Sequence, residues 1–510
     1  MRRSYLSLLS LVYLAILLAP VLFLFLDAGE PVQLDSTLVS EAILNTGLVS
    51  VFVVALCTFF GVSFAYWQVF YQTPGQNFLH IMTLMPLAFP AYVLAFVYIG
   101  NLGASSDWGI YHWFEIQGQT WFLVFILTLA LLPYIYFFSY LGLQWVRQSE
   151  WETEKLLQSG LGSFFRYAVW PHIGFFVVSG QVLVLFEALS DFGAASVINT
   201  PVMTTLIYKA WFDLFSFAGA VRLALWFSVL IFIVLFVELY MKSYRSGPQG
   251  SNLDPIQRQK LEGVKGLAVL SLRCLYILLA FTFPLLQVLL WAFQIHDTES
   301  LKATLWAGLH TFILSVCVAV TVIAVSLLLA FLFKKFKQLS SFGMIFSSVG
   351  YGIPGTILAV SFYGILRTLF TEVSVTLLVG TLILSLSYKF LSIGLKPIGE
   401  AVIQLPQNLD EMSLLFAVSW WQKMRVYWGP YLRESVIISL FLISLEVMKE
   451  MPLTLMLAPS EYPTLSIQIY NLTSEGEWEK ASVPSLILVF VGMISVFLVK
   501  ISQKEGPHES

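Results

Sequence analysis

The sequence predicts an all-α polytopic membrane protein with about 12 transmembrane helices in two parallel six-helix repeats. Three observations support this fold class. Of 510 residues, 58% are hydrophobic and 11% are charged, and the mean hydropathy is +0.82. Several uncharged runs exceed the roughly 20 residues that cross a bilayer. Similar blocks recur about 260 positions apart. Most classes of soluble enzyme are excluded, and a formal charge of -3 gives no sign of a nucleic-acid partner.

The uncharged runs define the spans in order along the chain. The first, Leu6 to Leu26, is read as a retained span, because no small-residue cleavage site follows it. Pro and Gly bends are expected within several of the later runs. The predicted spans are 5–27, 43–66, 78–100, 121–146, 171–190, 218–241, 266–293, 307–333, 342–366, 373–396, 430–450 and 484–503.

The distribution of Lys and Arg predicts the orientation. Most of the 27 basic residues lie in loops that this order of spans assigns to one face, which the positive-inside rule makes cytoplasmic. Both termini are therefore expected in the cytoplasm. Two basic residues, Arg273 and Lys389, instead lie inside predicted helices. The outer loops are short and acidic, which would attract a cationic substrate.

Comparison of the chain with itself indicates a duplication. Thr46 matches Thr311 at an offset of 265, and Pro90 matches Pro354 at an offset of 264. Further along, the offset becomes 259. Because six spans separate the copies, both halves share one orientation. We predict a first half over residues 1–245, a cytoplasmic linker over 246–265 and a second half over 266–510.

The source of energy is expected to lie outside the chain. No Gly-Lys-Ser/Thr phosphate-binding motif occurs, so either an ion gradient or a separate ATPase must drive transport. A major-facilitator-type carrier would have a basic loop between its second and third spans, whereas residues 67–77 carry no charge. The longest polar cytoplasmic segments within the halves follow the fourth span of each, about 147–170 and 397–429.

These two segments resemble the EAA loop of ABC-importer permeases, a cytoplasmic helix-turn-helix whose first helix docks on the ATPase. In the second, Glu411-Met412-Ser413 is followed by Ala417-Val418-Ser419 and Pro430, with alanine where the family usually has glycine. The alternative reading is a merely solvated helix pair. The residues assigned to ATPase coupling are Glu152, Gly160 and Arg166 in the first half and Glu411, Ala417 and Arg425 in the second.

Two acids recur near the outer end of the fifth span of each half. Glu187 lies sixteen residues after Pro171, and Glu446 lies sixteen after Pro430. A helix of sixteen residues is about 24 Å long, so each acid lies toward the outer part of the bilayer. Asp191 and Glu450 follow four positions later, on the same helical face, where like charges repel unless a cation or proton intervenes. A charge inside a bilayer is costly, so function is the default explanation.

Two alternatives are weighed for these features. The acids could be neutralised locally by Lys449 or hydrated at the interface. Pro90 and Pro354, the latter flanked by Gly352 and Gly355, interrupt the third span of each half. Such paired breaks mark a transport path or serve ordinary packing.

Two longer motifs resemble those of fused ferric-iron ABC permeases. The first is Glu187-Ala-Leu-Ser-Asp191-Phe-Gly193 followed by Thr204-Thr-Leu-Ile-Tyr208-Lys-Ala-Trp211-Phe212. The second is Leu445-Glu-Val-Met-Lys-Glu-Met-Pro452-Leu-Thr454-Leu, then Thr464-Leu and Ile469-Tyr470. The resemblance covers nearly the whole chain. It implies a type I importer permease of the bacterial inner membrane, a periplasmic iron-binding protein and two copies of an ABC ATPase that bind the ATP.

The chemistry of the acids agrees with that substrate, because a ferric ion is small and hard and prefers oxygen ligands. We hypothesise that Glu187, Asp191, Glu446 and Glu450 bind Fe³⁺ transiently along the path. Tyr208 and Tyr470 are weaker candidates, since interfacial tyrosines usually anchor helices. We expect no stably bound cofactor and no enzyme activity. A thiamine permease, a gradient-driven carrier and a membrane enzyme remain the alternatives, and the last has no catalytic constellation to support it.

Overall fold

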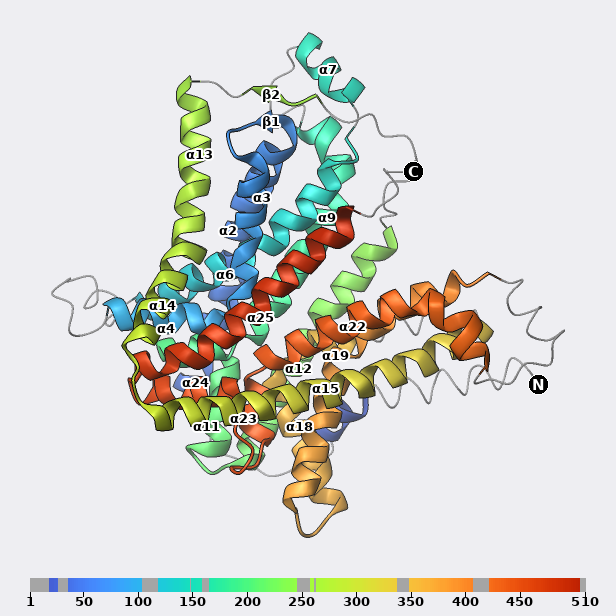
Figure 1. Ribbon diagram of the computed structural model, residues 1–510. Coiled ribbons are helices and arrows are strands. Elements are labelled where there is room, and N and C mark those ends of the chain that lie inside the picture. The colour runs from blue at the N-terminus through green and yellow to red at the C-terminus, as the bar shows by residue number, and fades with distance from the viewer. Residues whose placement is uncertain are drawn as a thin grey trace. The chain divides into compact units, whose positions relative to one another are not determined.

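The computed structural model is helical almost throughout, which confirms the predicted all-α fold class (Figure 1). The structure describes residues 18–25, 35–102, 118–146, 148–157, 165–244, 257–260, 263–336, 348–406 and 422–504. Within these ranges, the only strands are the two-residue β1 (Tyr71–Gln72) and β2 (Gln259–Lys260). Backbone groups in lipid must be bonded within their own segment, so helices are the expected solution.

The first half of the chain follows the predicted order of spans. Residues 18–25 of the first predicted span are helical, and the third predicted span is divided into several elements. The elements are α2 (Ser36–Phe70), α3 (Gln76–Leu84), the 3-10 turn η1 (Met85–Ala88), α4 (Ala91–Leu102), α6 (Gln119–Leu143), α7 (Gln148–Leu157), the π-helical turn η3 (Phe165–Val169), α9 (Trp170–Ser190), α10 (Gly193–Ile198), α11 (Met203–Phe212) and α12 (Phe217–Tyr244).

The second half repeats this order with small differences. Its first span is interrupted by a π-helical turn, and its third span is again divided. The elements are α13 (Gly263–Ile277), η4 (Leu278–Thr282), α14 (Phe283–Gln294), α15 (Thr298–Lys335), α17 (Val349–Gly352), α18 (Gly355–Leu369), α19 (Val375–Ile403), the π-helical turn η5 (Lys423–Trp428), α22 (Gly429–Lys449), α23 (Pro452–Leu457), α24 (Leu465–Ser474) and α25 (Trp478–Lys504).

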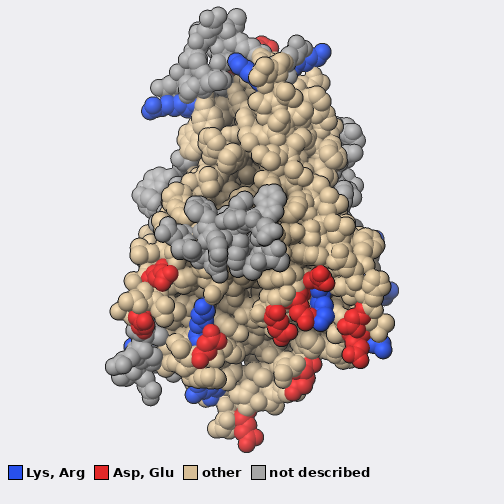
Figure 2. Space-filling view, turned by 90° about the vertical axis from the view of Figure 1, so that its left-hand side faces the viewer, with Lys and Arg blue, Asp and Glu red and all other residues tan. Residues whose placement is uncertain are grey.

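Seven of the described helices are long and apolar enough to cross a membrane. An eighth span is obtained if the bent pair 76–88 and 91–101 is taken as one. Large apolar side chains are exposed on these helices, as lipid-facing positions require; Phe59 on α2 and Leu305 on α15 are 67% and 69% exposed. Figure 2 shows a wide area of surface without Lys, Arg, Asp or Glu. The predicted multi-span membrane character is therefore confirmed.

The chain forms two compact units, and each unit takes segments from both halves. One contains residues 1–33, 207–231 and 298–468, and we call it the α15 unit; the other contains 34–206, 232–297 and 469–510, and we call it the α2 unit. In the α2 unit, α2, α6 and α9 pack against one another. In the α15 unit, α15, α19 and α22 do the same. The second, fourth and fifth spans of each half therefore form equivalent three-helix clusters.

Small residues allow the close approach of helices within these clusters. A Cβ on Gly61 of α2 would lie 3.0 Å from the Tyr136 nitrogen of α6, and a Cβ on Gly394 of α19 would lie 2.8 Å from Val322 Cγ1 of α15. Helices in lipid associate by such packing, because lipid tails are as apolar as the side chains themselves.

Part of the linker is ordered against the first half. β2 pairs in parallel with β1, with Tyr71 opposite Gln259. The main-chain N–H of Gln257 donates a 2.8 Å hydrogen bond to Gln148 Oε1 on α7, and Gln148 Nε2 donates to Glu152 Oε1 at 2.6 Å. This part of the predicted linker is thus bound to the beginning of α7.

Candidate functional site

Both predicted pairs of acids lie where the fifth span of each half ends. We call residues 187–193 the first acidic turn and residues 446–452 the second acidic turn. Asp191 follows directly after α9 with φ -63° and ψ 124°, and Glu450 follows α22 with φ -70° and ψ 119°. Both residues adopt the same extended conformation. The backbone therefore leaves α9 and α22 in the same way and continues into a short helix, α10 (Gly193–Ile198) or α23 (Pro452–Leu457).

The carboxylate of Asp191 is bound by the backbone of its own turn. It accepts hydrogen bonds from the main-chain N–H groups of Ala195 (3.0 Å) and Ala194 (3.4 Å), at the start of α10. The main-chain carbonyl of Asp191 accepts a 2.6 Å hydrogen bond from Thr204 Oγ1. Asp191 therefore satisfies N–H groups that a helix start leaves unpaired, and it joins the end of α9 to the beginning of α11.

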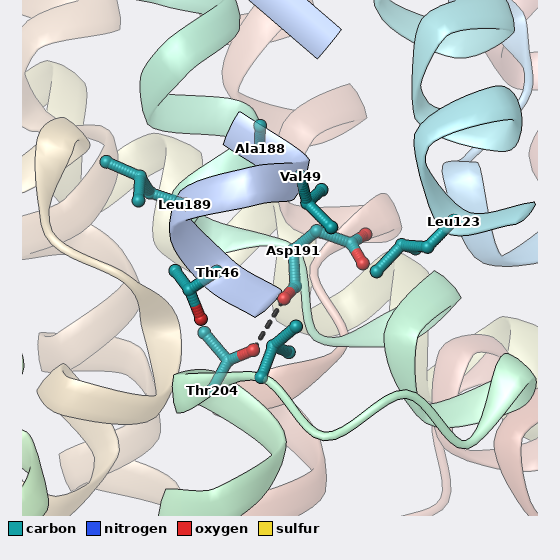
Figure 3. Close-up of a pocket in the computed structure, with 8 residues that line it drawn as sticks. Thr46, Val49, Leu123, Ala188, Leu189, Asp191 and Thr204 are labelled. Atoms are coloured by element: carbon teal, nitrogen blue, oxygen red, sulfur yellow. Dashed lines mark hydrogen bonds between the residues drawn. The ribbon is translucent and has the colours of Figure 1, made fainter. Parts of the chain in front are cut away.

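A small cavity adjoins Asp191 within the α2 unit. It is lined by Thr46, Val49, Leu123, Ala188, Leu189, Asp191, Val202 and Thr204 and has a volume of about 10 Å³. Figure 3 shows the Asp191 carboxylate turned toward Leu123, while its carbonyl faces Thr204. A volume of this size accommodates about one water-sized group. The cavity beside Asp191 therefore has room for about one water molecule.

The second acidic turn binds a cation supplied by the protein. Glu450 Oε2 lies 2.7 Å from Lys389 Nζ on α19, and each side chain is only 9% exposed. The main-chain carbonyl of Glu450 accepts hydrogen bonds from Thr454 Oγ1 (2.8 Å) and Ser466 Oγ (3.0 Å). Unlike the carboxylate of Asp191, that of Glu450 is compensated by a formal positive charge.

The two turns are anchored by the same pattern of hydrogen bonds. The N–H of Met203 donates to Thr46 Oγ1 at 2.9 Å, and the N–H of Leu465 donates to Thr311 Oγ1 at 2.8 Å. Thr204 and Ser466, the residues that follow Met203 and Leu465, donate to the main-chain carbonyls of the acids. Such detailed correspondence between residues about 260 positions apart supports the proposal of a duplicated chain.

Each acidic turn packs against the broken third span of its own half. The pair 76–88 and 91–101 bends by 89° around Pro90, and Pro354 precedes the first residue of α18. In the α2 unit, Gly193 packs on Tyr92, where a Cβ would lie 2.8 Å from the ring. In the α15 unit, Gly355 packs against the Glu450 carboxylate, with 2.5 Å from a Cβ to Oε1. The predicted breaks at both prolines are present, and they contact the acidic turns.

Glu187 and Glu446 lie one helical turn before Asp191 and Glu450, and both are partly buried. The local alternative proposed Lys449 as the neutralising cation. Glu450 itself forms its ion pair with Lys389, from a different helix. Within the described part of the chain, no group of three His, Cys, Asp or Glu side chains converges in a geometry that could hold a metal ion.

The two tyrosines are packed against aromatic neighbours. The ring of Tyr208 on α11 stacks on Phe212 at 4.8 Å between centroids. Tyr470 on α24 lies 6.0 Å from Phe192, which follows Asp191 in the first acidic turn. Tyr470 is therefore brought close to an acidic turn by contact with the residue after Asp191, whereas the described ring contacts of Tyr208 are those of packing.

Three of the residues predicted to couple to an ATPase lie in the described part of the chain and are exposed. Glu152 lies on α7, and Arg166 and Arg425 lie in the π-helical turns η3 and η5. Each π-helical turn leads into a helix with proline at its second position, Pro171 or Pro430. Gly160, Glu411 and Ala417 lie outside the described residues. The described segments that lead to Pro171 and Pro430 therefore have the same local structure.

Sequence reasoning missed the partners of the acids. Thr46 and Thr311 entered only as a match between the halves, and Lys389 only as a basic residue inside a helix. The signal that could have identified Lys389 was its place inside a predicted helix of the same half as Glu446 and Glu450. The choice of partner still depended on which helices pack together.

Comparison with known proteins gave one informative relative. The chain is 22% identical over 469 residues to the Fe(3+)-transport system permease protein FbpB 2 of Haemophilus influenzae, and the match covers 90% of each chain. No family model matches the sequence. The resemblance to ferric-iron permeases, which the two acidic motifs indicated, is confirmed by this relative, and it extends over both halves.

Proposed function

We propose that this chain is the membrane permease of an ABC importer that moves ferric iron inward across the bacterial inner membrane. The observation that carries the proposal is that each half holds a carboxylate turn against the break in its third span. A relative that matches over 90% of both chains is a Fe(3+)-transport permease, and this match supports ferric iron as the substrate. The protein is in this view a transporter rather than an enzyme.

The chemistry of the acidic turns suits a hard trivalent cation. Carboxylate oxygens are the ligands that such an ion prefers, and helix breaks place backbone carbonyl groups in the same region. Glu187, Asp191, Glu446 and Glu450 act as transient ligands along the path. Pro90 and Pro354 keep the third spans broken there. Tyr470 is the better placed of the two tyrosines to add an oxygen ligand, and Tyr208 the weaker candidate.

Separate ATPase subunits supply the energy in this proposal, one docked at each EAA-like loop. The repeated π-helical turns before Pro171 and Pro430 support two equivalent docking regions. The side chains of Glu152, Arg166 and Arg425 are exposed, as a docking surface for a soluble partner requires. The remaining coupling candidates are Gly160, Glu411 and Ala417. ATP binds to the partner, and the permease itself carries no resident cofactor.

The duplication places both halves in one orientation, with residues 1–245 and 266–510 as the halves and both termini in the cytoplasm. A periplasmic protein delivers the iron to the outer face, where the short acidic loops attract it. Because a periplasmic protein reaches only the outer face of the inner membrane, the permease is placed in that membrane.

Reconstitution tests this function directly. The permease is placed in liposomes with its ATPase, and the ferric-loaded binding protein is added outside. We expect ATP-dependent accumulation of radiolabelled iron and no accumulation of thiamine. Accumulation that needs only a proton or sodium gradient, with the ATPase omitted, would support a secondary carrier instead.

A variant with Gln at 187, 446 and 450 and Asn at 191 tests the assigned acids. We expect it to assemble with the ATPase and to lose iron uptake. The matched control replaces four exposed acids in the same way: Glu41, Asp213, Glu372 and Glu461. Iron uptake by the first variant at the rate of the control would remove the acids from the path.

A further inference from the structure

The ion pair between Lys389 and Glu450 joins elements that are distant in sequence. Lys389 lies in the middle of α19, and Glu450 ends α22. Their charged atoms are 2.7 Å apart, and both side chains are about nine-tenths buried. Removing two charges from water is costly, and well-packed apolar residues often stabilise a fold as well as a buried pair does. Stability alone therefore gives little reason for this pair.

Only one oxygen of the Glu450 carboxylate has a bonding partner. Oε2 receives Lys389, whereas Oε1 is buried and has no hydrogen-bond partner. An ionised carboxylate can accept about four hydrogen bonds, so one oxygen retains its full capacity to bind. The absence of a side chain at Gly355 leaves the space that Oε1 occupies at the start of α18. The pair thus presents an under-coordinated oxygen at the break in the third span.

The equivalent position in the first half has no such cation. The Asp191 carboxylate accepts hydrogen bonds from the N–H groups of Ala194 and Ala195 in its own turn. The helix that corresponds to α19 is α6, and no residue from Gln119 to Leu143 is charged. The acidic turns are therefore alike in backbone geometry and different in charge.

We propose that Lys389 is a tethered counter-cation that occupies the Glu450 carboxylate until a transported cation replaces it. The inference rests on the proposed function, because it assigns a role within the iron path. A trivalent ion attracts a carboxylate more strongly than a single ammonium does, so it displaces Nζ from Oε2 and uses Oε1 as a second ligand atom. The displaced ammonium then repels the ion and shortens its residence. Lys389 is a positioning residue, since it acts through Glu450.

The competing explanation is a permanent structural clamp. Both explanations predict that loss of Lys389 impairs folding, because it leaves a buried charge unpaired. They differ in metal binding. Under the exchange mechanism, removal of the lysine charge frees Glu450 for a metal. Under the clamp, metal affinity does not depend on residue 389.

The first experiment measures metal binding by the full chain in nanodiscs, without ATPase or binding protein. Terbium(III) serves as a luminescent trivalent probe. We expect Lys389→Gln to bind it about tenfold more tightly than wild type, which corresponds to about 1.4 kcal/mol. The increase should vanish in Lys389→Gln/Glu450→Gln. An increase of less than about fivefold, or an increase that persists in the double variant, overturns the proposal.

A second variant covers the case in which Lys389→Gln does not fold. Lys389→Arg keeps the charge, and its forked guanidinium can hold a carboxylate through two hydrogen bonds. We expect Lys389→Arg to match the thermal stability of wild type and to lower iron uptake at least about fivefold, because the tighter pair exchanges slowly. Uptake above half the wild-type rate overturns the exchange mechanism.

The terbium titration and the iron-uptake assay test this inference and the proposed function separately. If the wild-type importer accumulates no iron, the proposed function fails. The terbium titration still decides whether Lys389 competes with a trivalent ion for Glu450, because it needs only the permease.

Discussion

Glu450 Oε1 lies so close to Gly355 that a Cβ at this position would stand 2.5 Å from it. No real Cβ tolerates that approach, so Gly355→Ala must displace the carboxylate or the start of α18. We expect a loss of about 1–3 kcal/mol of stability, as for other overpacked sites. Thermal unfolding in detergent measures it. Gly380→Ala is the matched control, because nothing lies within 4 Å of a Cβ there. Equal melting temperatures for the two variants would contradict the tight contact.

Thr46 and Thr311 are expected to have equivalent structural roles. Thr46→Val removes the acceptor of the Met203 N–H, and Thr311→Val removes the acceptor of the Leu465 N–H. Leaving a buried N–H unpaired costs about 1–3 kcal/mol, so both variants should lose stability by a similar amount. Thr→Ser at the same sites keeps the hydroxyl and serves as the control. A loss at only one of the two sites would argue against equivalent anchoring of the acidic turns.

The two roles of Asp191 can be separated by substitution. Asp191→Asn keeps an oxygen that can accept from Ala194 and Ala195 but removes the charge. We expect nearly wild-type thermal stability with little iron uptake. Asp191→Ala should lose uptake and a further ~1 kcal/mol of stability, because the hydrogen bonds are lost as well. Full uptake by Asp191→Asn would show that only the helix cap matters.

Charge reversal at the EAA-like loops should weaken attachment of the ATPase. Arg166 and Arg425 are exposed and lie in equivalent π-helical turns. The double variant Arg166→Glu/Arg425→Glu is expected to recover several-fold less ATPase on affinity purification, because like charges across an interface repel. Glu372→Lys, another exposed site, is the control. Unchanged recovery would remove these two residues from the docking surface.

The predicted orientation can be tested by labelling single cysteines in a chain whose Cys57, Cys274 and Cys317 are replaced by alanine. A membrane-impermeant maleimide added to intact spheroplasts should label Glu475→Cys, in an outer loop. It should label Arg425→Cys only after the membrane is opened, because the positive-inside rule places that loop in the cytoplasm. Labelling of Arg425→Cys in intact spheroplasts would reverse the assigned topology.

The sequence by itself determined the fold class, the spans and the position of the acids. Bilayer thickness sets the length of an apolar run, and proline cannot continue a regular helix, so both signals are local. The break at Pro90, the start of α18 after Pro354 and the ends of α9 and α22 lie where these local signals predict. The proposed duplication likewise rests on residues alone, since Glu187 and Glu446 share their distance from a proline.

Only the tertiary structure decided how the acids are used. Asp191 and Glu450 have the same backbone conformation, yet one accepts hydrogen bonds from its own turn and the other binds Lys389, 61 positions away. That difference depends on which face of α19 packs toward α22, and spacing along the chain does not encode the contact of two helices. The absence of a side chain at Gly355 likewise matters only because the Glu450 carboxylate lies beside it. Local physics fixes where a helix ends, and packing fixes which charge meets that end.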